Sequence, residues 1–268
     1  MAERRVWLIG CGNMAGAMLK GWLAGGIAAE RFTVVRPSGK PVADDVPVRR
    51  DFPGQPFGDA IVQLGFKPYM LGDIAPAMAP LVGARTTIVS ILAGVDLETL
   101  RAAFPDARAI IRAMPNTPVA IRKGAVGLIA DDFGGEASRT VEALMARLGL
   151  AEWVADEALF NVVTALSGSG PAFLFRFIDA LAEAGAALGL DPAQALRLAV
   201  ATVEGGAALA AASDEAPGAL ADRVASPGGS TRKGLDVLDA EGALEMLLKQ
   251  TLAAAKRRNE QMAEEARG

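Results

Sequence analysis

The sequence predicts an α/β protein in which a doubly wound parallel sheet is followed by an all-α domain. Over residues 1–155, short apolar or β-branched runs alternate with helical patterns, which is typical of parallel strands joined by crossover helices. After that point strand signals become rare, and Ala, Leu and Glu dominate. We therefore expect one domain over residues 1–155 and a helical domain over residues 156–268.

The first domain supplies six strand candidates and three helices. Strands are expected at 6–9, 32–35, 60–64, 86–91, 109–111 and 127–129, and helices at 14–23, 72–82 and 97–104. Residues 37–58 are rich in Pro, Asp and Gly, so they are expected to be irregular. The helix that usually follows the second strand is then shortened or lost.

In the second domain the apolar pattern predicts helices at 156–166, 171–188, 192–212 and 241–265. Asp191 and Pro192 form a helix start, with Asp as the N-cap and Pro in the first turn. Small residues along these helices permit close packing between them. We expect their apolar faces to be buried between subunits, as a dimer or a larger ring, with a self-contained bundle as the alternative.

Composition excludes several classes of protein. The chain of 268 residues is 51% hydrophobic and carries a net charge of −4, so it lacks the basic excess of a nucleic-acid binder. One cysteine excludes a disulfide framework and fits a reducing, cytoplasmic compartment. The absence of His removes Ser-His-Asp machinery and His-ligated zinc, and we expect no metal site. Arg176, Asp179 and Glu183 interrupt the most apolar run, so no membrane span is expected.

A glycine-rich turn follows the first strand and opens the first helix. It reads Ile9-Gly10-Cys11-Gly12-Asn13-Met14, with Ala15 at the third small position. In this context the first glycine permits a tight turn, the second lets the backbone approach a pyrophosphate, and the third small residue permits helix–strand packing. The sequence thus predicts a dinucleotide-binding domain of the Rossmann type; a purely structural turn is the alternative.

The end of the second strand favours NADPH as the cofactor. An NAD site usually has Asp or Glu at this point to bind the ribose hydroxyls, whereas this chain has Arg36 and then Ser38. A cation and a hydroxyl suit a 2′-phosphate. NADH remains the less favoured alternative.

Further loops follow strands and are expected to line the same crevice, because ligands bind at the carboxyl ends of parallel strands. They comprise Gly65, Phe66, Lys67 and Pro68; Ile91, Leu92 and Ala93; and Asn116 between two prolines. Lys67 is either a catalytic lysine or a solvated one. The Asn116 amide is a candidate partner for a nicotinamide carboxamide.

Two motifs precede helices in the second half. One is Leu166-Ser167-Gly168-Ser169-Gly170-Pro171, and the other is Ser226-Pro227-Gly228-Gly229-Ser230-Thr231. Consecutive glycines and hydroxyls before a helix form an anion nest that fits a carboxylate. A flexible linker is the alternative.

Taken together and in this order, the motifs resemble the pyrroline-5-carboxylate reductase family over nearly the whole chain. The resemblance implies a cofactor domain followed by a dimerisation domain, and reduction of 1-pyrroline-5-carboxylate to L-proline by NAD(P)H, the last step of proline biosynthesis. It places the active site between the cofactor domain and helices contributed by the dimer.

The resemblance also assigns roles to residues. Thr231 is the expected catalytic residue, as an orienting hydroxyl for the imine nitrogen. The expected substrate-binding residues are Glu157, Ser226, Gly228, Gly229, Ser230 and Thr231. Two other functions stay open. They are a related NADP enzyme acting on hydroxyacids, with Lys67 polarising a hydroxyl, and a nonenzymatic NADP-binding protein.

Overall fold

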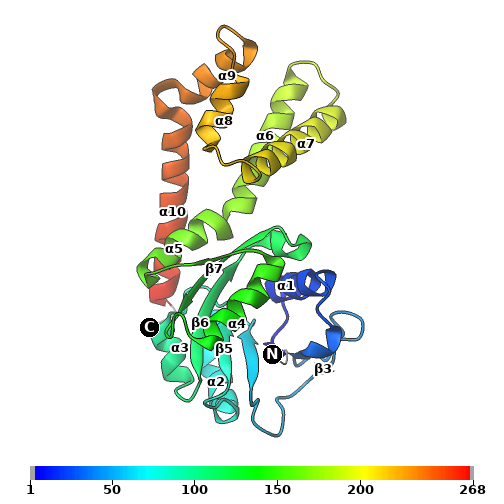
Figure 1. Ribbon diagram of the computed structural model, residues 1–268, viewed down its shortest axis with the longest axis vertical. Helices are drawn as coiled ribbons and strands as arrows, with labels where there is room; N and C mark the ends of the chain where they lie inside the picture. Colours follow the sequence, from blue (N-terminus) through cyan, green and yellow to red (C-terminus); the bar gives the residue numbers. More distant parts are fainter. Residues whose placement is uncertain (1–3, 266–268) are drawn as a thin grey trace. The chain divides into compact units, whose positions relative to one another are not determined.

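The computed structural model describes residues 4–265 and contains one eight-stranded sheet (Figure 1). The strand order is β3-β2-β1-β4-β5-β6-β7-β8. The strands are β1 (Arg5–Ile9), β2 (Phe32–Val35), β3 (Val48–Arg49), β4 (Ala60–Leu64), β5 (Thr87–Ser90), β6 (Ala109–Pro115), β7 (Gly124–Ala130) and β8 (Gly149–Trp153).

The sheet is parallel from β3 to β6, which confirms the predicted class, but its far edge is not. Strand β7 runs antiparallel to β6, and β8 runs parallel to β7. The reason is the connection between β6 and β7, the short 3₁₀ helix Thr117–Ile121, which is too short for a crossover. Strands β3 and β8 were not predicted. The order reverses between β1 and β4, so this is the switch point where ligands of such sheets bind.

Helices cover both faces of this sheet. On one face α1 (Asn13–Ala24) and α4 (Glu136–Met145) pack with alternate strand residues such as Val6 and Leu8. On the other face α2 (Leu71–Met78) and α3 (Leu97–Ala103) pack with the intervening residues, such as Trp7 and Ile9. The alternation along β1 therefore distributes its side chains between two cores, as a doubly wound sheet requires.

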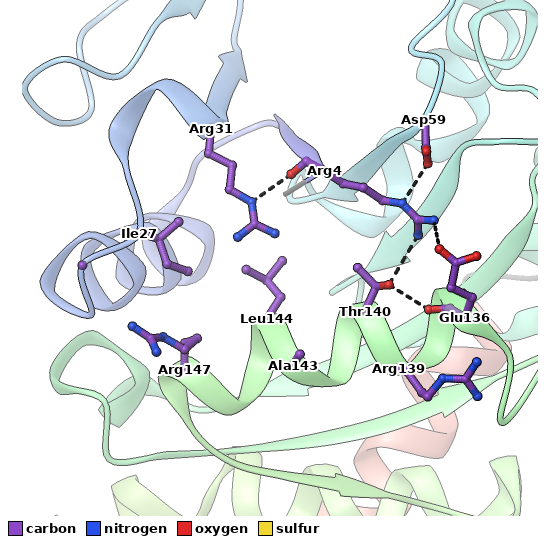
Figure 2. Close-up of a pocket in the computed structure, with 11 residues that line it drawn as sticks. Arg4, Ile27, Arg31, Asp59, Glu136, Arg139, Thr140, Ala143, Leu144 and Arg147 are labelled. Atoms are coloured by element: carbon purple, nitrogen blue, oxygen red, sulfur yellow. Dashed lines mark hydrogen bonds and ion pairs between the residues drawn. The ribbon is translucent and has the colours of Figure 1, made fainter. Parts of the chain in front are cut away.

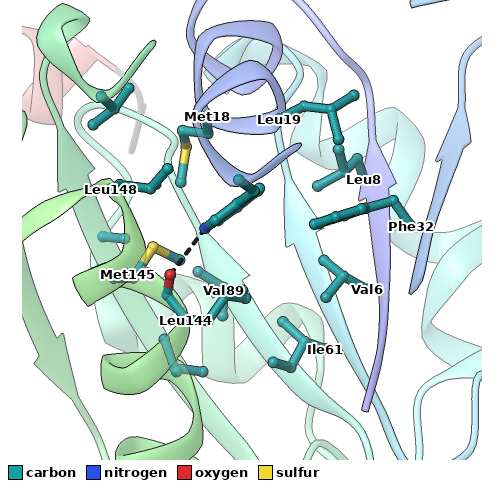
Figure 3. Close-up of a cluster of buried hydrophobic side chains, with 14 of the residues drawn as sticks. Val6, Leu8, Met18, Leu19, Phe32, Ile61, Val89, Leu144, Met145 and Leu148 are labelled. Atoms are coloured by element: carbon teal, nitrogen blue, oxygen red, sulfur yellow. Dashed lines mark hydrogen bonds between the residues drawn. The ribbon is translucent and has the colours of Figure 1, made fainter. Parts of the chain in front are cut away.

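The core beneath α1 includes Trp22, and Figure 3 shows Met18, Leu19, Phe32 and Leu144 among its side chains. The Trp22 ring stacks on Phe32 at 5.5 Å between ring centroids. Its Nε1 donates a 2.9 Å hydrogen bond to the Leu144 carbonyl at the end of α4. Because the indole N–H is satisfied in this way, a large aromatic side chain is buried without an unpaired donor. The bond also fixes α4 against α1.

The chain divides into two compact units, residues 1–169 with 255–268, and residues 170–254. This division differs from the expected one at 155/156. The short helix Glu157–Leu159, α5 (Phe160–Val163) and the π-helical turn Thr164–Gly168 belong to the first unit, where buried Phe160 packs with Met114 and Ile129 of the sheet. The helix expected over 156–166 is observed as the start of one continuous helical run, Glu157–Ala187, which passes from a 3₁₀ turn through α5 to the π-helical turn.

The second unit is helical, as expected. It contains α6 (Gly170–Ala187), α7 (Pro192–Ala211), α8 (Pro217–Val224), α9 (Ser230–Asp239) and most of α10 (Ala243–Glu265). Helices α6 and α7 lie side by side as an antiparallel pair (Figure 1). The Asp191 carboxylate accepts a 2.9 Å hydrogen bond from Gln194 N, which confirms the predicted N-cap of α7. Helix α9 is the helix expected after the glycine motif at 226–231, whereas α8 was not predicted.

Most of the large apolar side chains of this second unit are exposed. Its described buried apolar residues are Ala182, Ala195, Ala199 and Ala225, whereas Leu and Phe side chains of α6, α7 and α10 face outward. Exposed apolar surface on this scale marks an interaction surface. By length and composition alone, one described stretch, Glu157–Ala187, is also long and apolar enough to cross a membrane.

A cavity of about 680 Å³ lies next to the amino ends of the strands (Figure 2). Arg4, which precedes β1, forms ion pairs with Asp59 at 2.8 Å and Glu136 at 2.5 Å. The Arg31 Nε donates a 2.8 Å hydrogen bond to the Arg4 carbonyl. The polar wall of this cavity therefore belongs to a network that joins α4 to the sheet.

Candidate active site

The carboxyl ends of β1, β4, β5 and β6 meet at one edge of the sheet, because these strands are parallel neighbours. The loops that follow them contain the glycine-rich turn, residues 65–68, residues 91–93 and Asn116. The structure thus brings the expected cofactor loops of the first unit to a common edge, at the switch point of the sheet.

Two backbone segments touch across this switch point. Gly10 has φ +80°, and a Cβ added to it would lie 2.9 Å from the Gly65 carbonyl oxygen. A Cβ on Gly65 would lie 2.9 Å from the Gly10 oxygen and 3.0 Å from the Ala15 side chain. Only glycine fits at either position without moving the backbone. The small side chain of Ala15 permits the same close approach, as the fingerprint predicts.

Gly12 differs from Gly10 because no described residue of the protein requires a glycine there. Its backbone is in the extended region, at φ −81° and ψ −164°, and an added Cβ would meet no atom of residues 4–265 within 4 Å. Gly12 is the N-cap of α1 and carries no side chain to occupy the first-turn N–H groups of Asn13 and Met14. The positive end of the helix is thus left open to an anion that approaches closely.

Cys11 contributes its backbone to this turn rather than a reactive thiol. Its side chain is partly buried against the core beneath α1. Burial raises the pKa of the Cys11 thiol, and the nearby Arg36 cation opposes that rise. A thiol with a raised pKa is a poor nucleophile at neutral pH.

At the end of β2 the structure adds Arg50, which the sequence analysis missed, to the candidate cofactor residues. Arg36 N donates a 2.9 Å hydrogen bond to the Arg49 carbonyl, which ties the end of β2 to β3. The turn after β2 contains Ser38 and Gly39, and a Cβ on Gly39 would lie 2.9 Å from the Arg50 Nε. Arg50 therefore lies against the turn that carries Arg36 and Ser38. The irregular composition of residues 37–58 concealed this pairing.

The loops after β4 and β5 contribute mainly backbone. Lys67 is exposed and precedes the short 3₁₀ helix Pro68–Met70, while Phe66 packs into the core beneath α2 and α3. In the second loop Leu92 is 2% exposed, and its N–H donates a 3.2 Å hydrogen bond to Ser90 Oγ. Because the Leu92 side chain is part of the core, only its backbone is available to a ligand.

The Asn116 side chain joins two elements, because both its amide nitrogen and its amide oxygen form hydrogen bonds. Its Nδ2 donates a 3.0 Å hydrogen bond to the Ser167 carbonyl, and its Oδ1 accepts a 2.9 Å bond from Ala125 N. The side chain is buried. The structure therefore shows Asn116 bracing the π-helical turn against β7, a role that was not expected from the sequence.

Glu157, expected near the substrate, makes two internal contacts in the first unit. Its Oε1 accepts hydrogen bonds from Arg112 Nη1 at 2.6 Å and from Leu97 N, the first residue of α3, at 2.8 Å. No sequence pattern pointed to Arg112, which lies within a buried strand. These contacts give Glu157 partners that the sequence analysis did not identify.

The expected substrate loop lies in the second unit, directly before α9. Gly228 has φ +71°, and a Cβ on Gly229 would lie 2.6 Å from Ser226 Oγ. Gly229 is the N-cap of α9 and carries no side chain to occupy the first N–H groups of the helix. Ser230 and Thr231 are exposed in the first turn. The start of α9 therefore has no side-chain cap, and the anion site expected in this loop stays a prediction.

A glycine turn that opens a helix at the switch point of a parallel sheet defines a dinucleotide-binding protein of the Rossmann class. The family model described as pyrroline-5-carboxylate reductase dimerisation matches residues 157–262. The chain is also 35% identical to the pyrroline-5-carboxylate reductase of Pseudomonas aeruginosa, over 99% of each chain. It therefore belongs to the pyrroline-5-carboxylate reductase family.

Solved structures agree with this assignment. The pyrroline-5-carboxylate reductase of Coxiella burnetii is 31% identical and superposes with a TM-score of 0.87, over 97% of this chain and 98% of that one. The enzyme of Plasmodium falciparum, solved with NADP bound, shares the fold with a TM-score of 0.83 at 23% identity, over 98% of this chain and 99% of that one.

Replacing Asn116 by Ala should lower the free energy of unfolding by about 1–3 kcal/mol, because two partly buried backbone groups lose their partner. Urea denaturation measures this difference. Asn161→Ala is the matched control, since the backbone and not the side chain of Asn161 bonds to Asn259. An Asn116 variant as stable as the control would show that the brace contributes nothing.

Proposed function

We propose that this chain reduces the C=N bond of 1-pyrroline-5-carboxylate to give L-proline, with NADPH as the favoured hydride donor. The observation that carries the proposal is family membership over the full length of the chain. The glycine turn after β1 supports it, because a Cβ added to Gly12 would contact no described residue of the protein. The reaction belongs to NAD(P)H-dependent oxidoreductases, and membership of the family supports the same activity here.

The residues at the sheet edge fit a dinucleotide. The first-turn N–H groups of α1 would hold the pyrophosphate beside Gly12, and the backbone of Gly65–Pro68 and Ile91–Ala93 would flank the remainder of the cofactor. Arg36, Ser38 and Arg50 would hold a 2′-phosphate, since Arg36 and Ser38 belong to the turn after β2 and the Arg50 side chain lies against Gly39 of that turn. When bound, the dihydronicotinamide supplies the hydride.

The helical unit supplies the substrate contacts in this proposal. The backbone N–H groups at the start of α9 hold the substrate carboxylate, and Ser226 and Ser230 add hydroxyls around the loop. The Thr231 hydroxyl donates a hydrogen bond to the substrate nitrogen as it becomes an amine. A hydroxyl has too high a pKa to be a strong acid, so Thr231 orients the substrate while the iminium or water provides the proton.

The exposed apolar faces of the second unit account for self-association. The dimerisation family match includes the stretch Glu157–Ala187, and we propose that this stretch forms a subunit interface rather than a membrane span. The proposed assembly is a dimer or a ring of dimers. The protein works in the cytoplasm, with neither nucleic acid nor membrane as a partner.

The proposed function is tested by following NADPH absorbance with pyrroline-5-carboxylate and, separately, with a keto acid of similar size. We expect NADPH to be consumed with the imine only and L-proline to form in equal amount. Turnover of the keto acid in place of the imine would favour a hydroxyacid dehydrogenase. NADPH binding without any turnover would favour a nonenzymatic protein.

Gly12→Ala and Gly10→Ala should separate cofactor binding from folding. Because the Gly12 site is open within the protein, its Ala variant should keep its stability yet bind NADPH roughly tenfold more weakly or worse, by crowding the pyrophosphate. Gly10→Ala should cost about 1–3 kcal/mol of stability through its positive φ and its contact with Gly65. Fluorescence titration and urea denaturation measure the two effects. Normal NADPH affinity in Gly12→Ala would contradict the placement.

Arg36→Asp should weaken NADPH binding by about 1.5–3 kcal/mol, because a charge-assisted bond to the 2′-phosphate is lost. NADH affinity should change much less. Arg139→Asp, at the cavity beside the amino ends of the strands, is the control and should bind NADPH normally. Equal losses for NADPH and NADH would place Arg36 away from the 2′-phosphate.

Thr231→Ala should lower kcat/KM for pyrroline-5-carboxylate by roughly 10- to 150-fold, equivalent to a hydrogen bond of about 1.5–3 kcal/mol to a charged group. NADPH affinity should stay unchanged, and Thr231→Ser should retain most activity. Thr251→Ala removes another exposed hydroxyl of the same unit and is the control. Wild-type turnover by Thr231→Ala would show that the Thr231 hydroxyl has no role in the reaction.

A further inference from the structure

A buried arginine in the first unit has no role in the proposed chemistry. Arg112 lies within β6, where Ile110 and Met114 flank it on the same face, and it is 6% exposed. Its guanidinium carbon lies 4.3 Å from the centroid of the Phe160 ring. The side chain therefore sits under α5, inside the protein and away from solvent.

Arg112 and Glu157 join three separate segments. Arg112 Nη1 donates a 2.6 Å hydrogen bond to Glu157 Oε1, and the same oxygen accepts the 2.8 Å bond from Leu97 N. Leu97 begins α3 directly after the loop that leaves β5, and Asp96 caps that helix through Thr99 N at 2.8 Å. The pair thus fixes the point at which the loop over residues 91–96 ends.

Stability alone does not account for this pair. The Arg112 Nε is buried without a hydrogen-bond partner among the described residues. Burial lowers the pKa of Arg112, and the contact with Glu157 only opposes that effect. Arg112 is buried, whereas the Glu157 side chain is 33% exposed. Because the cost of burying an arginine offsets much of what its ion pair contributes to stability, an arginine here indicates a role in geometry.

The surroundings of Arg112 identify the segment whose geometry is controlled. Arg112 lines a small cavity of about 10 Å³ together with Ala93 and Gly94, the residues that follow Leu92 in the expected cofactor loop. Met114, Asn161, Thr164, Asn259 and Met262 complete the lining of this cavity. Arg112 therefore lies beside the loop after β5, while Glu157 holds the far end of the loop through Leu97 N.

We propose that Arg112 and Glu157 form a positioning pair that sets the backbone path of residues 91–96 and so aligns the hydride donor with the substrate. The inference rests on the proposed function, and it gives Glu157 an effect on the reaction that acts through the loop and not through contact with the substrate. Neither side chain is a catalytic residue in this account.

Single-turnover stopped flow tests the pair, with NADPH-loaded enzyme mixed with saturating pyrroline-5-carboxylate. Arg112→Met and Glu157→Gln should each slow hydride transfer by roughly 10- to 100-fold, because small misplacements of reacting groups have effects of this size. The amplitude per subunit should equal that of wild type. Arg112→Lys should recover part of the rate, and the double variant should be no slower than the slower single variant.

Arg101 and Asp131 provide a matched control within the same unit. The Asp131 carboxylate also binds an arginine and a backbone N–H, that of Ile110 at 2.8 Å, but near the amino end of β6. Arg101→Met and Asp131→Asn should lower the urea midpoint and leave the rate of hydride transfer unchanged.

The outcomes are distinct. A reduced amplitude with a wild-type rate in Arg112→Met and Glu157→Gln would indicate a purely structural pair and overturn the inference. Wild-type rates, or strictly additive effects in the double variant, would overturn it as well. If Arg112→Met does not fold, the rate of hydride transfer in Glu157→Gln tests the inference. This variant keeps an amide oxygen that accepts the hydrogen bond from Leu97 N. An inactive wild-type enzyme would instead contradict the proposed function.

Discussion

The close approach of Gly10 and Gly65 is the constraint on which the first unit depends. Each glycine lies where a Cβ would strike the carbonyl oxygen of the other, so the turns after β1 and β4 touch through their backbones. Two backbone hydrogen bonds of 2.8 Å hold these turns in place, one from Gly10 N to Val35 O and the other from Gly65 N to Ile9 O. The start of α1 is consequently fixed above the switch point of the sheet.

The location of the candidate active site follows from this contact between Gly10 and Gly65. The open N-terminus of α1 and the loops after β4 and β5 share one edge, whereas the cavity of about 680 Å³ lies beside the amino ends of the strands. The arginines of that cavity are engaged with backbone carbonyls or carboxylates of the same chain. Cavity size is therefore a poorer guide to the site than the direction of the strands.

The sequence was informative where local chemistry decides structure. The fingerprint, the parallel strands and the Asp191 cap were predicted because glycine, β-branched runs and capping residues act within a few positions. The pairing of β3 with β2, the reversal of β7 and the Arg112–Glu157 contact were not, because each depends on residues distant in sequence. The hydrogen bonds of Asn116 could not be predicted for the same reason. The neighbouring prolines indicated a rigid segment, but the partners Ser167 and Ala125 come from other elements.

Amide hydrogen exchange with and without NADPH tests the central claim, that the carboxyl edge of the sheet holds the cofactor. The account predicts slower exchange for residues 10–16 and 65–68 on binding, with the amides of α4 unchanged. Protection confined to α4 and the cavity beside it, or no protection in the glycine turn at saturating NADPH, would contradict the account.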